Sequence, residues 1–239
     1  MMEITAFGRI AAGAALVLAL AYWAFYTGRG GAPDLAGALV KTGSVALLAL
    51  VLWQVAMRGG ALPLFWLVAL GLTLGALGDF CLARSGEAWF LAGMGAFGAG
   101  HLAYALALIL RGRALGGGLA GLQPAELLVL AALVLLILST EIWLAPRTGG
   151  LLWPVRAYVL LIALMGLAAI LLPAAPGQGL IRLGAALFLA SDLMLAIGLF
   201  VAQSAGLKTG LSLALWPAYW AAQALIGLGA LRLWAPTAG

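Results

Sequence analysis

Two aspartates of this chain stand in matching segments, each in an apolar setting where a charge is costly. The segments read Gly78-Asp79-Phe80-Cys81-Leu82-Ala83 and Ser191-Asp192-Leu193-Met194-Leu195-Ala196, and long uncharged runs precede both aspartates. An ionisable residue inside hydrocarbon is expensive and by default marks a functional site. Two carboxyl groups in similar surroundings could serve as a general acid and a general base.

Basic residues precede the aspartates at matching positions. The spacing from Lys41 to Arg156 equals that from Asp79 to Asp192 to within two residues. This pattern predicts two four-helix repeats of the same orientation, about 8–110 and 124–234, within a single domain of residues 1–239. Polar side chains in a membrane turn toward protein rather than lipid, so we expect these four residues to form one polar centre between the repeats.

Further polar residues share helix faces with aromatic rings. Phe97, His101 and Tyr104 follow at i, i+4 and i+7, and Trp216, Tyr219 and Gln223 are spaced similarly. Such residues by themselves are typical of helix packing. The presence of the two aspartates is the reason to consider them as site candidates. The candidates are Asp79 and Asp192 as catalytic residues, and Lys41, His101, Tyr104, Arg156, Tyr158, Tyr219 and Gln223 as substrate-binding residues.

The amino-acid composition indicates the environment that surrounds these helices. Of 239 residues, 66% are hydrophobic and 8% are charged, and the mean hydropathy of +1.18 is far above that of water-soluble domains. The apolar runs are long and do not alternate, which predicts an all-α integral membrane protein rather than a β-barrel. We expect eight membrane-spanning helices at about 8–26, 35–57, 61–83, 88–110, 124–145, 152–172, 181–201 and 211–234.

The loops indicate an orientation and a location. Placing the N-terminus in the cytoplasm gives the inner side Arg9, Arg58, Arg111, Arg113, Arg182 and Arg232, and the outer side Arg29, Arg84, Arg147 and Lys208. This difference favours both termini in the cytoplasm. Ten arginines against two lysines, with abundant Ala, Gly and Leu, are typical of a GC-rich bacterial genome, so we expect the bacterial inner membrane.

Several classes of function are disfavoured. The charges are scattered singly, without the basic block that nucleic acid requires, and the basic excess suits anionic membrane lipids. One histidine and one cysteine, Cys81, make a zinc site improbable, although two aspartates and His101 could bind a metal weakly. The sequence has no Gly-x-Ser-x-Gly elbow and no Walker loop. Nothing in it sets the oligomeric state.

The order of these motifs resembles that of the YhhN family of membrane lysoplasmalogenases, whose animal members have eight transmembrane helices. The matching elements are Lys41, Gly78-Asp79-x-x-Leu82, Phe90-x-x-Gly93-x-x-x-Phe97-x-x-x-His101-x-x-Tyr104, Pro154-x-x-x-Tyr158, Gly184-x-x-x-Phe188-x-x-Ser191-Asp192 and Tyr219-x-x-x-Gln223. Thr42 departs from the pattern, because a proline is expected after the lysine.

This resemblance implies hydrolysis of the vinyl ether bond of a lysoplasmalogen to a fatty aldehyde and a glycerophosphoethanolamine or glycerophosphocholine. No cofactor is required. Lys41 and Arg156 would hold the lipid phosphate, Tyr158 or Tyr219 would meet the ammonium by cation–π attraction, and the apolar chain would lie between glycine-lined helices.

The chemistry needs a protonated acid and a carboxylate that stabilises positive charge and activates water. By expected depth in the membrane, we assign Asp192 as the acid and Asp79, nearer the mouth, as the base; the reverse order is the alternative. Two other functions use the same residues: a proton-coupled lipid or small-molecule transporter, and a bundle in which the charges only lock helices together.

Overall fold

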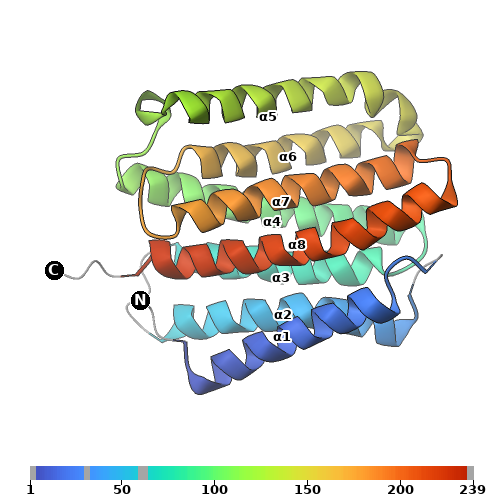
Figure 1. Cartoon of the computed structure of the whole chain (residues 1–239), viewed down its shortest axis with the longest axis horizontal. Coiled ribbons are helices and arrows are strands. Elements are labelled where there is room, and N and C mark those ends of the chain that lie inside the picture. Colours follow the sequence, from blue (N-terminus) through green and yellow to red (C-terminus); the bar gives the residue numbers. More distant parts are fainter. Residues whose placement is uncertain (1–3, 30–32, 59–63, 236–239) are drawn as a thin grey trace.

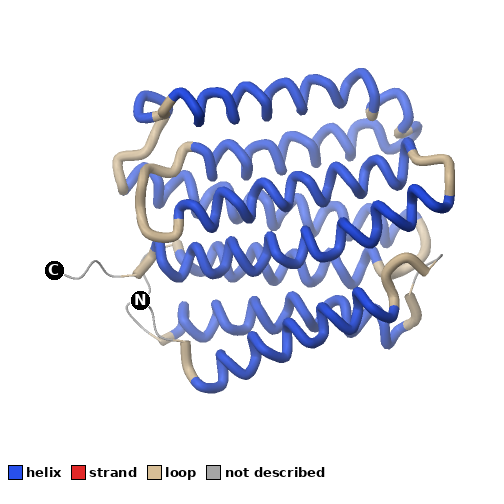
Figure 2. Tube along the Cα trace, in the orientation of Figure 1, coloured by secondary structure: helices blue, strands red, loops and turns tan. Residues whose placement is uncertain are grey.

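The computed structural model describes residues 4–29, 33–58 and 64–235, and these residues fold into eight helices long and apolar enough to cross a membrane. The described chain contains no β-strand, which confirms the all-α class (Figure 2). The helices are α1 (Ala6–Phe25), α2 (Leu35–Met57), α3 (Phe65–Leu82), α4 (Glu87–Ala114), α5 (Pro124–Trp143), α6 (Leu152–Ile170), α7 (Gln178–Ala196) and α8 (Ala205–Leu233). The protein is therefore an integral, multi-pass membrane protein.

Helix ends differ from the predicted spans where polar residues continue a helix beyond its apolar run. Helix α8 begins at Ala205 because Ser204 caps it, its hydroxyl accepting from the Leu207 amide at 3.2 Å. Helix α4 continues to Ala114, and Arg111 in its last turn donates to the Leu233 carbonyl of α8 at 2.8 Å. The first residues of the span predicted at 61–83 lie outside the described residues.

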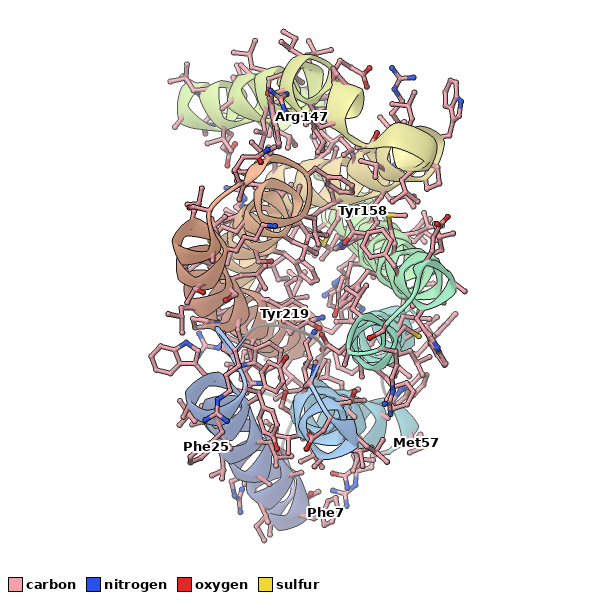
Figure 3. The ribbon with its side chains drawn as sticks, turned by 90° about the vertical axis from the view of Figure 1, so that its right-hand side faces the viewer. Phe7, Phe25, Met57, Arg147, Tyr158 and Tyr219 are labelled. Carbon is pink, nitrogen blue, oxygen red and sulfur yellow. The ribbon has the colours of Figure 1, made fainter. Side chains whose placement is uncertain are left out.

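Six helices form a closed ring. Each of α2, α3, α4, α6, α7 and α8 packs against the next in that order, and α8 closes the ring on α2. Figure 3 looks along the helices and shows this ring, with α1 outside it beside α2 and α8, and α5 outside it beside α6. The helices that begin the two predicted repeats are thus the two outside the ring. The repeat itself stays a prediction.

Two tryptophans attach α1 to the ring. Pro217 of α8 lacks an amide N–H, so the Leu213 carbonyl one turn earlier loses its helical donor. The indole of Trp23 donates to that carbonyl at 2.9 Å, and the indole of Trp216 donates back to the Ala19 carbonyl at 2.9 Å. Helix α1 is therefore held against α8 by directed hydrogen bonds.

All eight helices run nearly parallel or antiparallel to one another (Figure 1). The first residues of α1 and the last residues of α8 lie at the same end of the bundle. Both ends of the described chain therefore face the same side of the membrane, and the expectation that this side is the cytoplasm stays a prediction.

Glycine permits a close approach of α7 to α8. A Cβ atom at Gly184 would lie 2.8 Å from Ile226 Cγ1 and 2.9 Å from the backbone oxygen of Ala222. Helices in lipid associate through such small residues, because packing rather than the hydrophobic effect drives their contact.

Gly184→Ala should therefore force α7 and α8 apart. We expect a loss of about 1–3 kcal/mol of stability, the usual cost of overpacking, measured as a lower midpoint of thermal unfolding in detergent. Gly179→Ala is the matched control, because a Cβ at Gly179 of the same helix meets nothing within 4 Å. Equal midpoints for the two variants would contradict this packing.

Candidate active site

Asp79 lies at the centre of the first polar cluster. Its Oδ1 is 3.1 Å from the Lys41 ammonium of α2, and its Oδ2 accepts from the Tyr219 hydroxyl of α8 at 2.7 Å. The Asp79 side chain is almost fully buried, with 2% of its surface exposed, and that of Lys41 is 16% exposed. A carboxylate buried to this degree needs both a cation and a hydrogen-bond donor, and here it has both.

Aromatic rings hold the Lys41 ammonium in place. Its Nζ lies 5.9 Å from the ring centre of Tyr22 and 5.8 Å from that of Trp216, within the range of cation–π attraction. Tyr22 comes from α1, so the outer helix also contributes to the cluster. No motif in the sequence singles out this tyrosine, which stands near the end of a span where aromatic residues usually serve as interface anchors.

A chain of hydrogen bonds supports Tyr219 from behind. The Tyr104 hydroxyl donates to Gln223 Oε1 at 2.5 Å, so the amide nitrogen of Gln223 faces Tyr219 and donates to its hydroxyl oxygen at 3.2 Å. The proton of Tyr219 is then directed at Asp79. Tyr104 and Gln223 are fully buried and do not line the cavity described below. They therefore orient Tyr219 and do not themselves reach the cavity.

Asp192 forms the second cluster, with residues of α4 and α6. The Tyr158 hydroxyl donates to Asp192 Oδ2 at 2.6 Å, and His101 Nε2 lies 3.1 Å from the same hydroxyl and 3.4 Å from Oδ2. The contacts to Asp192 all use Oδ2. Its side chain is 16% exposed, so Asp192 is more open than Asp79.

The neighbours of His101 indicate which ring nitrogen carries a hydrogen. Because the Tyr158 hydroxyl donates its hydrogen bond to Asp192, His101 Nε2 carries the hydrogen that points at the Tyr158 oxygen. The other ring nitrogen, Nδ1, is buried and finds no hydrogen-bond partner among the described residues. A hydrogen on Nδ1 would therefore be a buried donor without a partner among the described residues.

Aromatic rings separate the two clusters. The Phe188 ring of α7 lies 4.7 Å from the His101 ring and 5.3 Å from the Tyr219 ring, centre to centre. Phe97 of α4 packs on Tyr219 at 5.6 Å. This apolar divider lets the two aspartates keep different surroundings inside one ring of helices.

Both aspartates line one cavity of about 150 Å³, the outer cavity. Its polar lining includes Lys41, Tyr158 and Tyr219, and the two labelled tyrosines lie in the interior of the bundle in Figure 3. The rest of the lining is apolar and includes residues of α6, of α7 and of the side of α5 that faces the protein. The polar lining residues of the outer cavity are Lys41, Asp79, Thr140, Tyr158, Ser191, Asp192 and Tyr219.

Arg156 does not join this centre, contrary to the expected meeting of two cations and two anions. Its guanidinium makes three hydrogen bonds of 3.0, 3.1 and 2.5 Å to Glu141 of α5, and it lies over the Trp153 ring. Tyr158, two residues later and so on another face of α6, occupies the position beside Asp192. The match of spacing with Lys41 therefore selected the wrong residue of α6.

The burial of the two aspartates is the reverse of what their expected depth in the membrane implied. Asp192 was expected to be the more desolvated carboxyl, whereas Asp79 is the more buried one and also has the cation. Depth along a helix gives no measure of burial here, because Asp79 is enclosed by residues of α1, α2 and α8 that are distant in sequence.

The two aspartates follow one plan of contacts. Asp79 of α3 is met by residues of α2 and α8, and Asp192 of α7 is met by residues of α6 and α4. Each carboxyl thus receives one partner from the preceding helix and one from the last helix of the other half. Among the described residues, no group of three His, Cys, Asp or Glu side chains could hold a metal ion.

These features define a polytopic helical membrane protein with one buried and one partly buried carboxyl group on a shared cavity. The chain belongs to the YhhN family, whose model matches residues 36–230 and so includes every candidate site residue. Searches of curated proteins and of solved structures found no match.

Removal of the Lys41 charge tests the first cluster. Lys41→Met would leave Asp79 buried without its cation, and we expect a loss of about 3–5 kcal/mol of unfolding free energy, measured by denaturation in detergent. Adding Asp79→Leu to this variant should restore most of that loss. Lys208→Met removes an exposed cation and should have little effect. A double variant no more stable than Lys41→Met would refute a direct pair.

Proposed function

We propose that this protein is a membrane hydrolase that cleaves the vinyl ether bond of lysoplasmalogens. The products are a fatty aldehyde and glycerophosphoethanolamine or glycerophosphocholine. The observation that carries the proposal is that two carboxyl groups, one paired with a lysine and the other with a tyrosine and a histidine, line a single largely apolar cavity. Membership of the YhhN family is consistent with this reaction.

Asp192 is the proposed acid. A vinyl ether is hydrolysed by protonation of the alkene carbon that is not bonded to oxygen. This step creates an oxocarbenium ion at the other alkene carbon. The proton must come from a group that holds it until the substrate is in place. Asp192 suits this role because no lysine or arginine pairs with it among the described residues, and because Tyr158 and His101 bind only its Oδ2.

Asp79 is the proposed base. Lys41 and Tyr219 stabilise its charged form, and the negative charge in turn stabilises the oxocarbenium ion. Water adds to that cation and gives its proton to Asp79, forming a hemiacetal. The hemiacetal hydroxyl then returns a proton to Asp192 while Asp79 protonates the departing glycerol oxygen. Aldehyde is released, and both carboxyl groups recover their starting states.

The other polar residues orient this pair. His101 and Tyr158 fix the direction of the Asp192 carboxyl, and Tyr104 and Gln223 keep the Tyr219 hydroxyl hydrogen directed at Asp79. Such preorganised groups lower the barrier, because they need no rearrangement as charge develops.

The lipid head group is proposed to bind at the rim, where α5 and α6 meet. Arg156 would contact the phosphate and its partner Glu141 the ammonium, so the existing ion pair would open around a zwitterionic head group. Lys41 then acts mainly as the counter-ion of Asp79. The rings of Tyr158 and Tyr219 remain candidates for a cation–π contact with the ammonium.

Replacement of the two aspartates tests the function. Purified protein should release aldehyde from 1-alkenyl lysophospholipid without added metal, and Asp79→Asn and Asp192→Asn should each lower the rate at least about 100-fold, because general acid–base catalysis is worth that much or more. Glu87→Gln removes one exposed carboxylate at the start of α4 and should keep the wild-type rate.

A transporter would behave differently. It would move the lipid across sealed vesicles and leave its mass unchanged, which mass spectrometry detects. Full activity in either asparagine variant would remove that aspartate from the mechanism, and unchanged lipid with the wild-type protein would refute the hydrolase.

A further inference from the structure

The geometry points to a second binding site, an inner cavity that takes the far end of a long hydrocarbon chain whose vinyl ether lies at Asp192. This inference rests on the proposed function, and it adds a structural basis for selecting substrates by chain length. The inner cavity has a volume of about 410 Å³ and lies between α5, α6 and α7.

The two cavities belong to one groove. On α5, Val129 and Leu133 line the inner cavity, and Ile137 and Thr140 line the outer one. Their spacing of three or four residues puts them on one face of the helix. Leu133 and Thr140 are also the two buried residues of α5, so this face is the one turned toward the protein.

Helices α6 and α7 carry matching stripes. On α6 the lining runs from Tyr158 and Ile162 in the outer cavity to Gly166 and Ala169 in the inner one. On α7 it continues from Asp192 to residues of the inner cavity that end at Arg182. The lining residues of α7 are Arg182, Ala185, Ala186, Leu189, Ser191, Asp192, Leu193, Leu195 and Ala196.

Leu189 stands between the cavities and lines both. Its Cδ1 lies 3.0 Å from the position that a Cβ would take at Gly166, and Leu133 Cδ2 lies 3.3 Å from the same point. Two leucine side chains therefore meet over a glycine of α6 and form a constriction. Flexible side chains of this kind can move aside for an apolar chain.

The inner cavity has the chemistry of a hydrocarbon site. Apart from Glu126 and Arg182, its lining is apolar, and those two residues already satisfy each other. Arg182 donates to Glu126 at 2.5 Å and to the carbonyls of Ile170 and Leu172 at 2.8 Å each, which caps the end of α6. With the bond from its Nε to the Ala169 carbonyl at 3.2 Å, four of the five N–H groups of Arg182 are occupied, and the Glu126 carboxylate beside them disfavours an anion, so an alkyl chain is the occupant that fits.

The length of the groove makes it a chain-length selector. Ala185 lies seven residues from Asp192 on α7, which corresponds to about 10 Å along the helix axis. A short alkenyl chain with its vinyl ether at Asp192 ends at or before the constriction, whereas a long chain must pass Leu189. Residues of the inner cavity therefore affect long substrates alone.

The experiment fills the inner cavity and measures hydrolysis of two substrates. Ala186 lines the inner cavity at its exposed side, so Ala186→Phe should block it without disturbing the core. We expect kcat/KM for a long-chain 1-alkenyl lysophospholipid to fall roughly tenfold relative to that for a short-chain one, the usual effect of an apolar pocket that excludes a methylene or two. Ala190→Phe makes the same change at an exposed position of α7 outside both linings and should leave the ratio unchanged.

A second readout does not need turnover. A 1-alkyl lysophospholipid, which cannot be hydrolysed at this bond, would carry a diazirine at the end of a long chain. After irradiation, mass spectrometry should find the label on peptides containing Val129 or Ala186 in wild type and in Ala190→Phe, and not in Ala186→Phe.

The outcomes separate the two proposals. No aldehyde from either substrate, with the label still in the inner cavity, would refute the reaction and leave the chain site standing. A normal rate with an unchanged ratio in Ala186→Phe would overturn the chain site. Labelling confined to lipid-facing residues of α5 such as Leu128 and Leu135 would also overturn it.

Discussion

The fold depends on keeping two carboxyl groups inside a membrane. Burial of a charge costs several kcal/mol unless partners compensate it, and neither aspartate could be accommodated by its own helix. Asp79 needs Lys41 from α2 and Tyr219 from α8, and Asp192 needs Tyr158 from α6 and His101 from α4. These contacts join all six helices of the ring, so the polar centre and the closure of the ring stabilise each other.

The difference between the two clusters suits the site to the proposed acid–base reaction. One carboxyl has a lysine held between aromatic rings, and the other has a histidine and a tyrosine. Identical clusters would give two carboxyl groups of similar proton affinity, which is a poor arrangement for an acid and a base. Phe188 stands between them and preserves the contrast.

The sequence was sufficient for the helices and for most of the site. Apolar runs placed all eight spans, because hydrocarbon thickness sets their length, and helix periodicity put His101 and Tyr104 on one inward face. It could not predict which helices would be neighbours in the ring. Hence it missed Tyr22 beside Lys41 and Glu141 beside Arg156. The burial order of the aspartates depends on those same contacts, which is why depth along the chain gave the wrong order.

The proposed reaction begins with the transfer of a proton to an alkene carbon. Hydrolysis of a 1-alkenyl lysophospholipid in deuterated water tests this step, since the exchangeable acidic proton is then a deuteron and the carbon–deuterium bond retains it. We expect one deuterium on the carbon next to the aldehyde group, with an authentic aldehyde incubated in parallel to correct for exchange. Aldehyde without deuterium above that control, or recovery of the intact lipid alone, would contradict the proposed reaction.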